Sequence, residues 1–91
     1  LRENLYYYPH QAIIKHHEKS ISLSAHESCF MNMLCKNRGH IVNSRLIEEY
    51  VWPMEYVSDG TVAALVYRLR KKLPEEDIIR TVIGIGYCLD E

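Results

Sequence analysis

The sequence predicts an α+β domain in which short antiparallel strands come first, three helices follow and a β-hairpin ends the chain. Three observations support this fold class. Strand-prone apolar runs lie in residues 1–23, apolar residues recur at helical spacing in residues 24–73, and two β-branched runs separated by glycine lie in residues 78–89. At 91 residues the chain is predicted to fold as one domain, 1–91.

The first 23 residues are predicted to form a small antiparallel sheet. Breaks at Pro9–His10 and at the polar stretch Glu18–Ser20 divide this segment into short runs. The runs predicted to be strands are Leu5–Tyr8, Ala12–Lys15 and Ile21–Leu23.

The first helix is predicted at Ala25–Lys36, because Ser24 and Glu27 have the spacing of a capping box. In that motif the serine hydroxyl accepts from the backbone amide three residues later, and the glutamate carboxylate accepts from the serine amide. Asn37–Gly39 favours the end of the helix. The apolar stripe of this helix comprises Phe30, Met31, Met33 and Leu34.

The second helix is predicted to begin at Asn43 or Ser44, either of which can cap it. It ends at Trp52–Pro53, because proline disfavours helical geometry in the residue before it. After a short loop, Ser58 or Asp59 can cap the third helix. The apolar positions of the second helix are Leu46, Ile47, Tyr50 and Val51.

The third helix is the most informative about function. Its apolar residues recur at spacings of three and four and predict one buried stripe: Val62, Leu65, Val66, Leu69 and Leu73. The opposite face combines small residues, which let a backbone approach DNA bases, with long cations that reach guanine acceptors or phosphates. A solvated helix with a basic face is the simpler alternative. The residues of the opposite face are Thr61, Ala64, Tyr67, Arg68, Lys71 and Lys72, with Ala63 and Arg70 at its flanks.

The chain after the third helix is predicted to form a hairpin. The acidic stretch Glu75–Asp77 turns the chain, and residues 78–83 and 85–89 have the pattern of two strands. Gly84 and Gly86 allow a tight turn between the strands. Three helices followed by this hairpin define a winged helix-turn-helix.

The net charge of −1 does not by itself indicate a nucleic-acid binder, but the distribution of charge does. The third helix has four cations and no acid between Thr61 and Leu73, and a second acid-free basic stretch covers residues 36–45. The residues expected to neutralise phosphate are Arg68, Arg70, Lys71 and Lys72, with Arg45 as a further candidate.

The composition argues against several other classes. No apolar run approaches the ~20 residues of a membrane-spanning helix, so we expect no membrane contact by this domain. The three cysteines form no CxxC pair and the histidines lack zinc-site spacing, so we expect reduced thiols in a cytoplasmic protein, with no metal and no cofactor. The sequence has neither a nucleophile elbow nor a phosphate-binding glycine loop, so no enzyme activity is expected.

Four short motifs lie in order along the chain: Leu23–Ser24–x–x–Glu27, Val51–Trp52, Thr61–Val62 with Arg68–Leu73, and Thr81–Tyr87. Each is weak alone. Together, in this order and at this spacing, they resemble the OmpR/PhoB-type winged-helix effector domains, the output half of many bacterial two-component response regulators. The motifs match the opening of that family's first helix, the end of its second helix, its recognition helix and its wing.

This resemblance implies a four-stranded N-terminal sheet, a trihelical core and binding to repeated DNA sites as a homodimer. It also implies an upstream domain in the full-length protein, for which a phosphorylated receiver is the commonest arrangement in the family. A non-phosphorylated receiver or a membrane-tethered regulator is equally compatible with these residues. The loop that the resemblance implies as a contact for RNA polymerase comprises Pro53, Met54, Glu55, Tyr56 and Val57.

The resemblance further implies a set of DNA contacts. The third helix would lie in the major groove, with Ala64 and Arg68 facing bases. The implied contacts to the phosphates, the sugar–phosphate backbone or the groove edge come from Thr61, Tyr67, Arg70, Trp52 and Thr81.

The sequence departs from that family at three places. Gly60 stands where a basic or polar residue is common, and Ala63–Leu65 stands where Asp-Val-His is common. Ile83 replaces a wing arginine that could enter a minor groove, although an apolar residue there can still pack on sugars. We therefore expect fewer polar base contacts than in relatives and a greater dependence on Arg68 and on phosphate contacts.

The sequence thus predicts sequence-specific binding of double-stranded DNA by the effector domain of a bacterial transcription regulator. Helix 58–73 would lie in the major groove and wing 78–89 on the backbone or in the minor groove. The alternative is a winged helix that acts only as a protein-interaction module. The near-neutral charge, the aromatic segment Tyr6–Tyr8 and the apolar residues at Ala63–Leu65 all permit this alternative.

Overall fold

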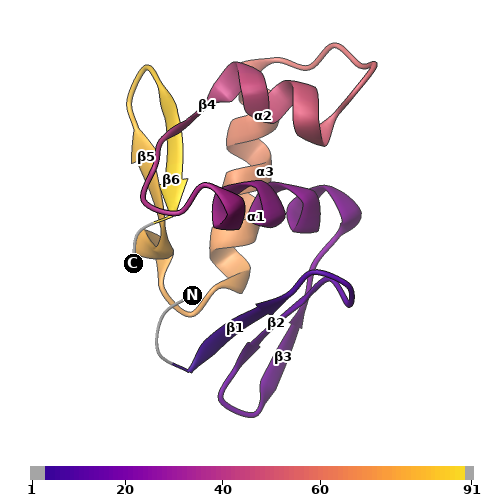
Figure 1. The fold of residues 1–91 in the computed structure, drawn as a ribbon, viewed down its shortest axis with the longest axis vertical. Helices are drawn as coiled ribbons and strands as arrows, with labels where there is room; N and C mark the ends of the chain where they lie inside the picture. The colour runs from indigo at the N-terminus through magenta and orange to yellow at the C-terminus, as the bar shows by residue number, and fades with distance from the viewer. Residues whose placement is uncertain (1–3, 90–91) are drawn as a thin grey trace.

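The computed structural model describes residues 4–89 and has the predicted α+β architecture. In Figure 1 a first antiparallel sheet lies below the helices, a second lies to their left, and α1 crosses α3. The elements are β1 (Leu5–Tyr8), β2 (Ile13–His16), β3 (Lys19–Ser22), α1 (Ala25–Lys36), β4 (Val42–Asn43), α2 (Ser44–Val51), α3 (Asp59–Lys72), the 3₁₀ helix η1 (Glu76–Ile78), β5 (Ile79–Val82) and β6 (Gly86–Leu89).

The first sheet has the order β1-β2-β3 and differs from the sequence prediction in its third strand. The sequence predicts a polar break at Glu18–Ser20, but β3 starts at Lys19, which pairs with His16 of β2. The chain reverses at His17 instead, where φ is +58°. The polar residues Lys19 and Ser20 therefore belong to β3 and pair with β2 instead of interrupting the strand. Of the four strands that the family resemblance implies, three lie within residues 4–89.

The predicted caps of α1 and α2 are confirmed. The Glu27 amide donates to Ser24 Oγ at 3.1 Å, and the Ser24 amide donates to Glu27 Oε1 at 2.8 Å, which completes the capping box. Asn43 caps α2 by accepting from the amide of Leu46 at 2.9 Å. Ser58 occupies the N-cap position of α3 but makes no side-chain cap hydrogen bond.

The buried stripe predicted for α3 forms the centre of the core. All five of its apolar residues are buried, and they pack with apolar residues from α1, α2 and both sheets. The rings of Phe30 on α1 and Tyr87 on β6 form a T-shaped pair, with ring centroids 6.0 Å apart. This packing fixes the buried side of α3 and leaves its opposite side at the surface. The stripe comprises Val62, Leu65, Val66, Leu69 and Leu73.

The second sheet has the order β4-β6-β5 and contains a strand that the sequence prediction lacks. The two residues of β4 pair with β6, Val42 opposite Tyr87 and Asn43 opposite Gly86. An added Cβ at Gly86 would lie 2.0 Å from the carbonyl oxygen of Val42, so this pairing needs glycine. Gly84 has the role predicted for it, since its φ of +77° lies in the turn of the hairpin.

Candidate nucleic-acid interface

The exposed side of α3 presents a small-residue surface next to cations. Ala63, Ala64, Tyr67 and Arg68 are all exposed, and they lie opposite the buried stripe. Within residues 4–89 no hydrogen bond or ion pair engages the guanidinium group of Arg68. The ammonium of Lys71 lies 5.1 Å from the centre of the Tyr67 ring, a cation–π distance that leaves both side chains at the surface.

A hollow separates α3 from the wing and brings together residues that are distant in the sequence. One part, of about 390 Å³, lies between the start of α2, Ala63 and the turn of the hairpin, and is lined by Arg45 and Thr81. A second part, of about 470 Å³, lies between Tyr67, Arg70 and the wing. The two parts share Ala63, Thr81 and Tyr87 in their linings, so the start of α2, the exposed side of α3 and the base of the wing border neighbouring hollows.

Arg70 connects α3 to the wing. Its guanidinium donates to the carbonyl oxygen of Ile79 through Nε, at 3.2 Å, and through Nη2. Nη2 also donates to the hydroxyl of Thr81 at 2.8 Å. Two of the residues predicted to meet DNA are thus bonded to one another, and they hold the base of the wing against the helix.

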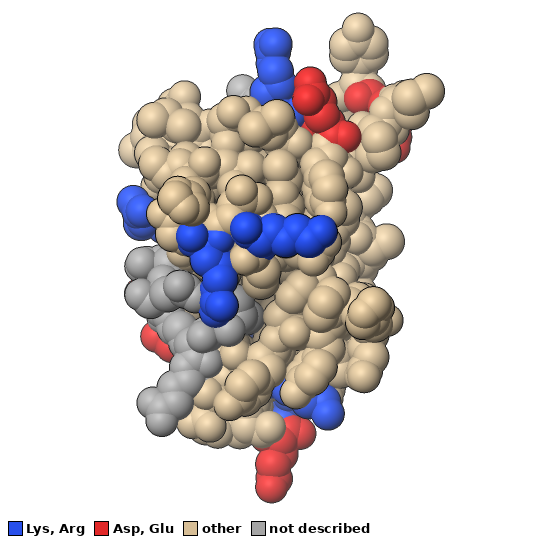
Figure 2. All heavy atoms as spheres, viewed as in Figure 1, with Lys and Arg blue, Asp and Glu red and all other residues tan. Residues whose placement is uncertain are grey.

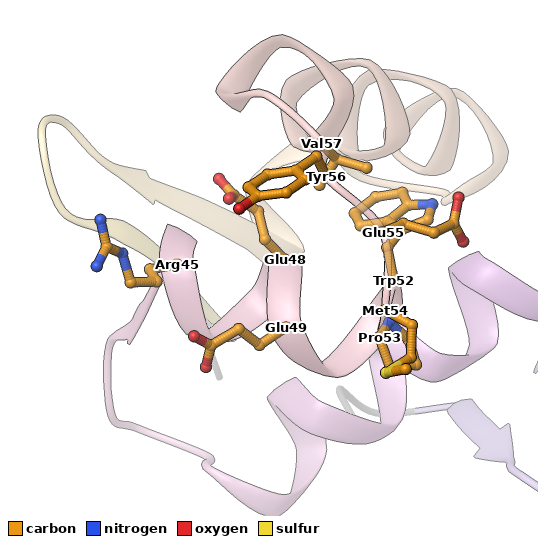
Figure 3. Close-up of a pocket in the computed structure, with 9 residues that line it drawn as sticks. All are labelled: Arg45, Glu48, Glu49, Trp52, Pro53, Met54, Glu55, Tyr56 and Val57. Carbon is orange, nitrogen blue, oxygen red and sulfur yellow. The ribbon is translucent and has the colours of Figure 1, made fainter.

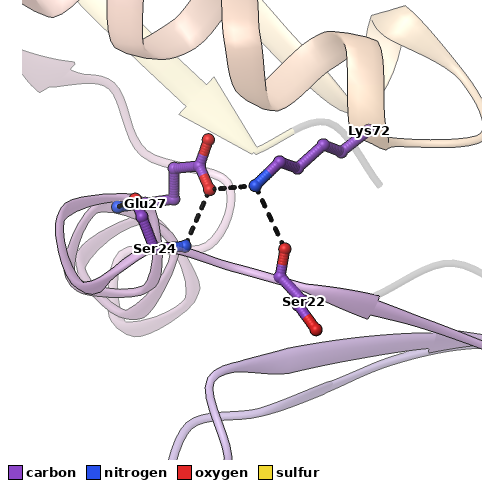
Figure 4. A network of polar contacts seen from close by, with 4 residues as sticks. All are labelled: Ser22, Ser24, Glu27 and Lys72. Carbon is purple, nitrogen blue, oxygen red and sulfur yellow. Dashed lines mark hydrogen bonds and ion pairs between the residues drawn. The ribbon is translucent and has the colours of Figure 1, made fainter.

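Lys72, also predicted to meet phosphate, points back into the protein (Figure 4). Its ammonium donates to Glu27 Oε1 at 2.6 Å and to the carbonyl oxygen of Ser22 at 3.1 Å. Burial alone raises the pKa of the Glu27 carboxyl, but the hydrogen bonds from Lys72 and from the Ser24 amide outweigh burial and hold the pKa below its ordinary value. The network joins the end of α3 to α1 and β3.

Trp52, implied by the resemblance as a backbone contact, is only 5% exposed and belongs to the core. Its ring stacks obliquely on the exposed His26 of α1, with centroids 5.2 Å apart. The structure therefore leaves little of the indole for a sugar–phosphate backbone and gives Trp52 a packing role.

The loop between α2 and α3 carries fully exposed apolar side chains. Met54 and Tyr56 are fully exposed, and Met54 has a φ of +69°. The loop borders a surface cavity of about 670 Å³ whose rim also carries the carboxylates of Glu48, Glu49 and Glu55 (Figure 3). In Figure 2 acidic side chains appear at this upper end next to a Lys or Arg side chain, and further Lys and Arg side chains lie across the middle of the face. Arg45 also lines the cavity beside the loop.

Some residues at this interface were not predicted as site residues. Asn43 and Ser44 line the hollow because β4 places the start of α2 beside the wing, where the Ser44 amide donates to the carbonyl oxygen of Ile85 at 3.0 Å. Tyr87 borders both parts of the hollow. Its place in the Thr81–Tyr87 motif was the only signal for it in the sequence.

Other site types find no support in the described part of the chain. No group of three or more His, Cys, Asp or Glu residues within 4–89 is arranged to hold a metal ion. The three cysteines, all within the described residues, are not joined in disulfides; Cys88 is buried, and Cys29 and Cys35 are half-buried. None of the helices described for residues 4–89 is long and apolar enough to cross a bilayer.

The fold and the concave surface beside α3 are those of a winged-helix domain. Residues 18–89 match the family model described as "Transcriptional regulatory protein, C terminal", and the chain belongs to this family. This agrees with the resemblance deduced from the sequence motifs, and the relatives are response regulators and other regulatory proteins.

Two relatives and one solved structure illustrate the similarity. The transcriptional regulatory protein QseB of Escherichia coli O157:H7 is 41% identical over 73 residues, which cover 78% of this chain and 32% of QseB. The regulatory protein VanR of Enterococcus faecium is 32% identical over 80 residues, covering 81% of this chain and 35% of VanR. The chain thus spans about a third of the length of these relatives. The DNA-binding domain of Klebsiella pneumoniae RstA, solved in complex with the RstA box, has a TM-score of 0.81 at 24% identity and covers 94% of this chain and 90% of that domain.

Proposed function

We propose that this domain binds double-stranded DNA sequence-specifically, with α3 in the major groove and the wing on the backbone or in the minor groove. The observation that carries the proposal is Arg68, a guanidinium that is exposed beside the small side chain of Ala64 and engaged by no described residue. An arginine that has no partner within the protein, and that lies next to a small side chain on the same helix, can reach the hydrogen-bond acceptors of guanine. The family of the chain and the DNA complex of the RstA domain support this function.

The exposure of the other predicted site residues supports the remaining proposed contacts. Lys71 and Arg45 are exposed and can neutralise phosphates on either side of the groove. Thr61 is half-buried in the first turn of α3, where its hydroxyl and the positive end of the helix dipole suit a phosphate. Arg70 and Thr81 act as a bonded pair at the base of the wing, so the two share any contact to the backbone.

The tip of the wing would make an apolar contact. Ile83 is 92% exposed and occupies the hairpin turn next to Gly84. A side chain of this kind can pack on sugars or against a base step but makes no electrostatic contact in a minor groove. The wing would therefore contribute shape recognition instead of arginine-based recognition of narrow grooves.

We expect Arg68→Ala to weaken binding to the cognate site by about 1–3 kcal/mol more than binding to random DNA, because a bidentate arginine–guanine contact discriminates between bases. The cognate site is first selected from random duplexes with the wild-type domain, and both affinities are then measured by titration at two salt concentrations. Lys71→Ala is the matched control and should weaken both kinds of DNA alike. An equal loss on both DNAs in Arg68→Ala would restrict Arg68 to phosphate. No binding by the wild type at low salt would instead favour the protein-interaction module.

The larger assembly is also proposed. Relatives more than twice as long as this chain support an upstream receiver domain in a two-component response regulator. Binding as a homodimer to repeated half-sites would match the family, and the spacing of the selected half-sites tests it. We place the protein in the cytoplasm, where DNA and reduced cysteines are both expected, and we assign it a binding function without catalysis.

The loop between α2 and α3 is proposed to contact RNA polymerase. Its support is the exposure of Met54 and Tyr56 beside an acidic rim, which suits a basic partner surface with an apolar pocket. We expect Tyr56→Ala to leave DNA affinity unchanged and to weaken capture of bacterial RNA polymerase holoenzyme on the domain–DNA complex by more than about 1 kcal/mol. Tyr6→Ala, at an exposed tyrosine of β1, is the control. Equal capture by both variants would remove the loop from the polymerase interface.

A further inference from the structure

The last turn of α3 carries a cation that is bound internally although it shares a helix face with Arg68. Lys72 lies four residues after Arg68, so the two side chains project from the same side of the helix. The ammonium of Lys72 nevertheless reaches Glu27 Oε1 at 2.6 Å and the carbonyl oxygen of Ser22 at 3.1 Å (Figure 4). One side chain thus joins the end of the recognition helix to α1 and to β3.

The acceptor of this contact is held in place on its other side. Glu27 is only 2% exposed, and the oxygen that receives Lys72 also accepts from the Ser24 amide. A buried carboxylate that loses a partner keeps its desolvation cost, so the pair resists separation. Because the capping box fixes Glu27 at the first turn of α1, Lys72 is bound to a rigid point and not to a mobile surface acid.

We propose that Lys72 is a positioning residue for DNA recognition: its contact with Glu27 fixes the rotation and axial position of α3, so that Arg68 meets base edges. The inference rests on the proposed DNA-binding function. It assigns Lys72 a role different from the phosphate contact expected from the sequence. Arg70 secures the same helix on its other side by binding Ile79 of the wing strand. Recognition by Arg68 then depends on a helix held at both flanks.

The test separates positioning from phosphate contact and from loss of stability. Lys72→Met, Lys72→Arg, Glu27→Gln and Lys71→Met are compared with the wild type on the selected site and on random DNA, over a series of salt concentrations. Lys72→Met should reduce the ratio of specific to random affinity about tenfold, a part of the discrimination that one bidentate contact supplies. The slope of the logarithm of its binding constant against the logarithm of the salt concentration (the salt slope) should equal that of the wild type. Lys71→Met should lower the slope by up to about one and keep the ratio.

Two further variants keep the test decisive if Lys72→Met folds poorly. Lys72→Arg retains a donor cation and should restore most of the ratio. Glu27→Gln keeps a side chain that suits the capping box but removes the negative charge, and it should lower the ratio with an unchanged slope. Partial unfolding alone reduces the active fraction, which lowers both affinities equally and leaves the ratio unchanged.

Each opposite outcome overturns the inference. A slope lowered by about one in Lys72→Met, with the ratio unchanged, would make Lys72 a phosphate contact. Equal ratios in the wild type, Lys72→Met and Glu27→Gln would give the pair no role in recognition, while the proposed function would stand. A wild-type domain that binds no DNA at low salt would overturn the proposed function and this inference together.

Discussion

Gly86→Ala is expected to lower the free energy of unfolding by about 3 kcal/mol or more, which for a domain of this size corresponds to a fall in Tm of roughly 12–24 °C. The added Cβ would lie 2.0 Å from the carbonyl oxygen of Val42 and 2.7 Å from the Cα of Asn43. Both are backbone atoms, so no side chain can rotate away, and β4 must separate from β6. Thermal and urea denaturation followed by circular dichroism measure the loss.

Gly84→Ala is the matched control for this prediction. Gly84 has a φ of +77° and open space where a Cβ would be placed, so alanine costs only the strain of the left-handed region, about 1–2 kcal/mol. The two glycines are in one hairpin but are required for different reasons. If Gly86→Ala is no less stable than Gly84→Ala, close approach of β4 is not the reason for glycine at position 86.

The consequence of Gly86→Ala extends to the interface, because β4 leads directly into α2. The Ser44 amide donates to the carbonyl oxygen of Ile85, and Arg45 follows at the edge of the hollow. Moving β4 would displace both residues relative to the wing. A folded fraction of Gly86→Ala should therefore show weaker DNA binding than its loss of stability alone explains.

The sequence predicts the helices well because their determinants are local. The capping box at Ser24 and Glu27 gives the start of α1, and the apolar period of α3 gives its buried side, as the structure confirms. The strand β4 is absent from the prediction because its two residues have no pattern of their own. Only the pairing of Val42 with Tyr87, far along the chain, makes this segment a strand.

For the candidate site, too, the sequence predicts the features that depend on local pattern and misses those that depend on tertiary contacts. Exposure of Arg68 and Lys71 follows from helical periodicity and could be predicted. The internal partners of Arg70 and Lys72 could not, since periodicity identifies the exposed face of a helix but not what packs beside that face. Glu27 lies 45 residues before Lys72, and the sequence showed its capping role without its second hydrogen bond. For Trp52 the motif match implies a contact with the DNA backbone at the surface, whereas in the structure its side chain is 5% exposed and packs in the core.

The second large effect expected is a dependence of the Lys72→Met destabilisation on pH. At pH 7 the variant should lose about 2 kcal/mol, less than the about 3–5 kcal/mol of a fully buried pair because the Lys72 side chain is 38% exposed. The loss arises because Glu27 stays buried while its cation is gone. Urea denaturation of the variant and the wild type across pH 3–7 measures this difference in the free energy of unfolding.

The sign follows from the lowered pKa of Glu27 in the folded protein. A carboxyl whose folded pKa lies below its ordinary value of 4.5 stabilises the fold above that value, and this stability is lost as the pH falls through the folded pKa. The destabilisation by Lys72→Met should therefore be constant near neutrality and shrink as the pH falls towards the lowered pKa of Glu27 in the folded wild type.

Lys71→Met is the control, because Lys71 is exposed and lies against the Tyr67 ring instead of a carboxylate. Its effect should stay within about 0.5 kcal/mol and show no such trend. A loss in Lys72→Met that is the same at pH 3 and pH 7 would mean that the ammonium of Lys72 stabilises α3 through the Ser22 carbonyl. In that case the charge of Glu27 would not anchor the recognition helix, and Glu27→Gln should leave DNA recognition intact.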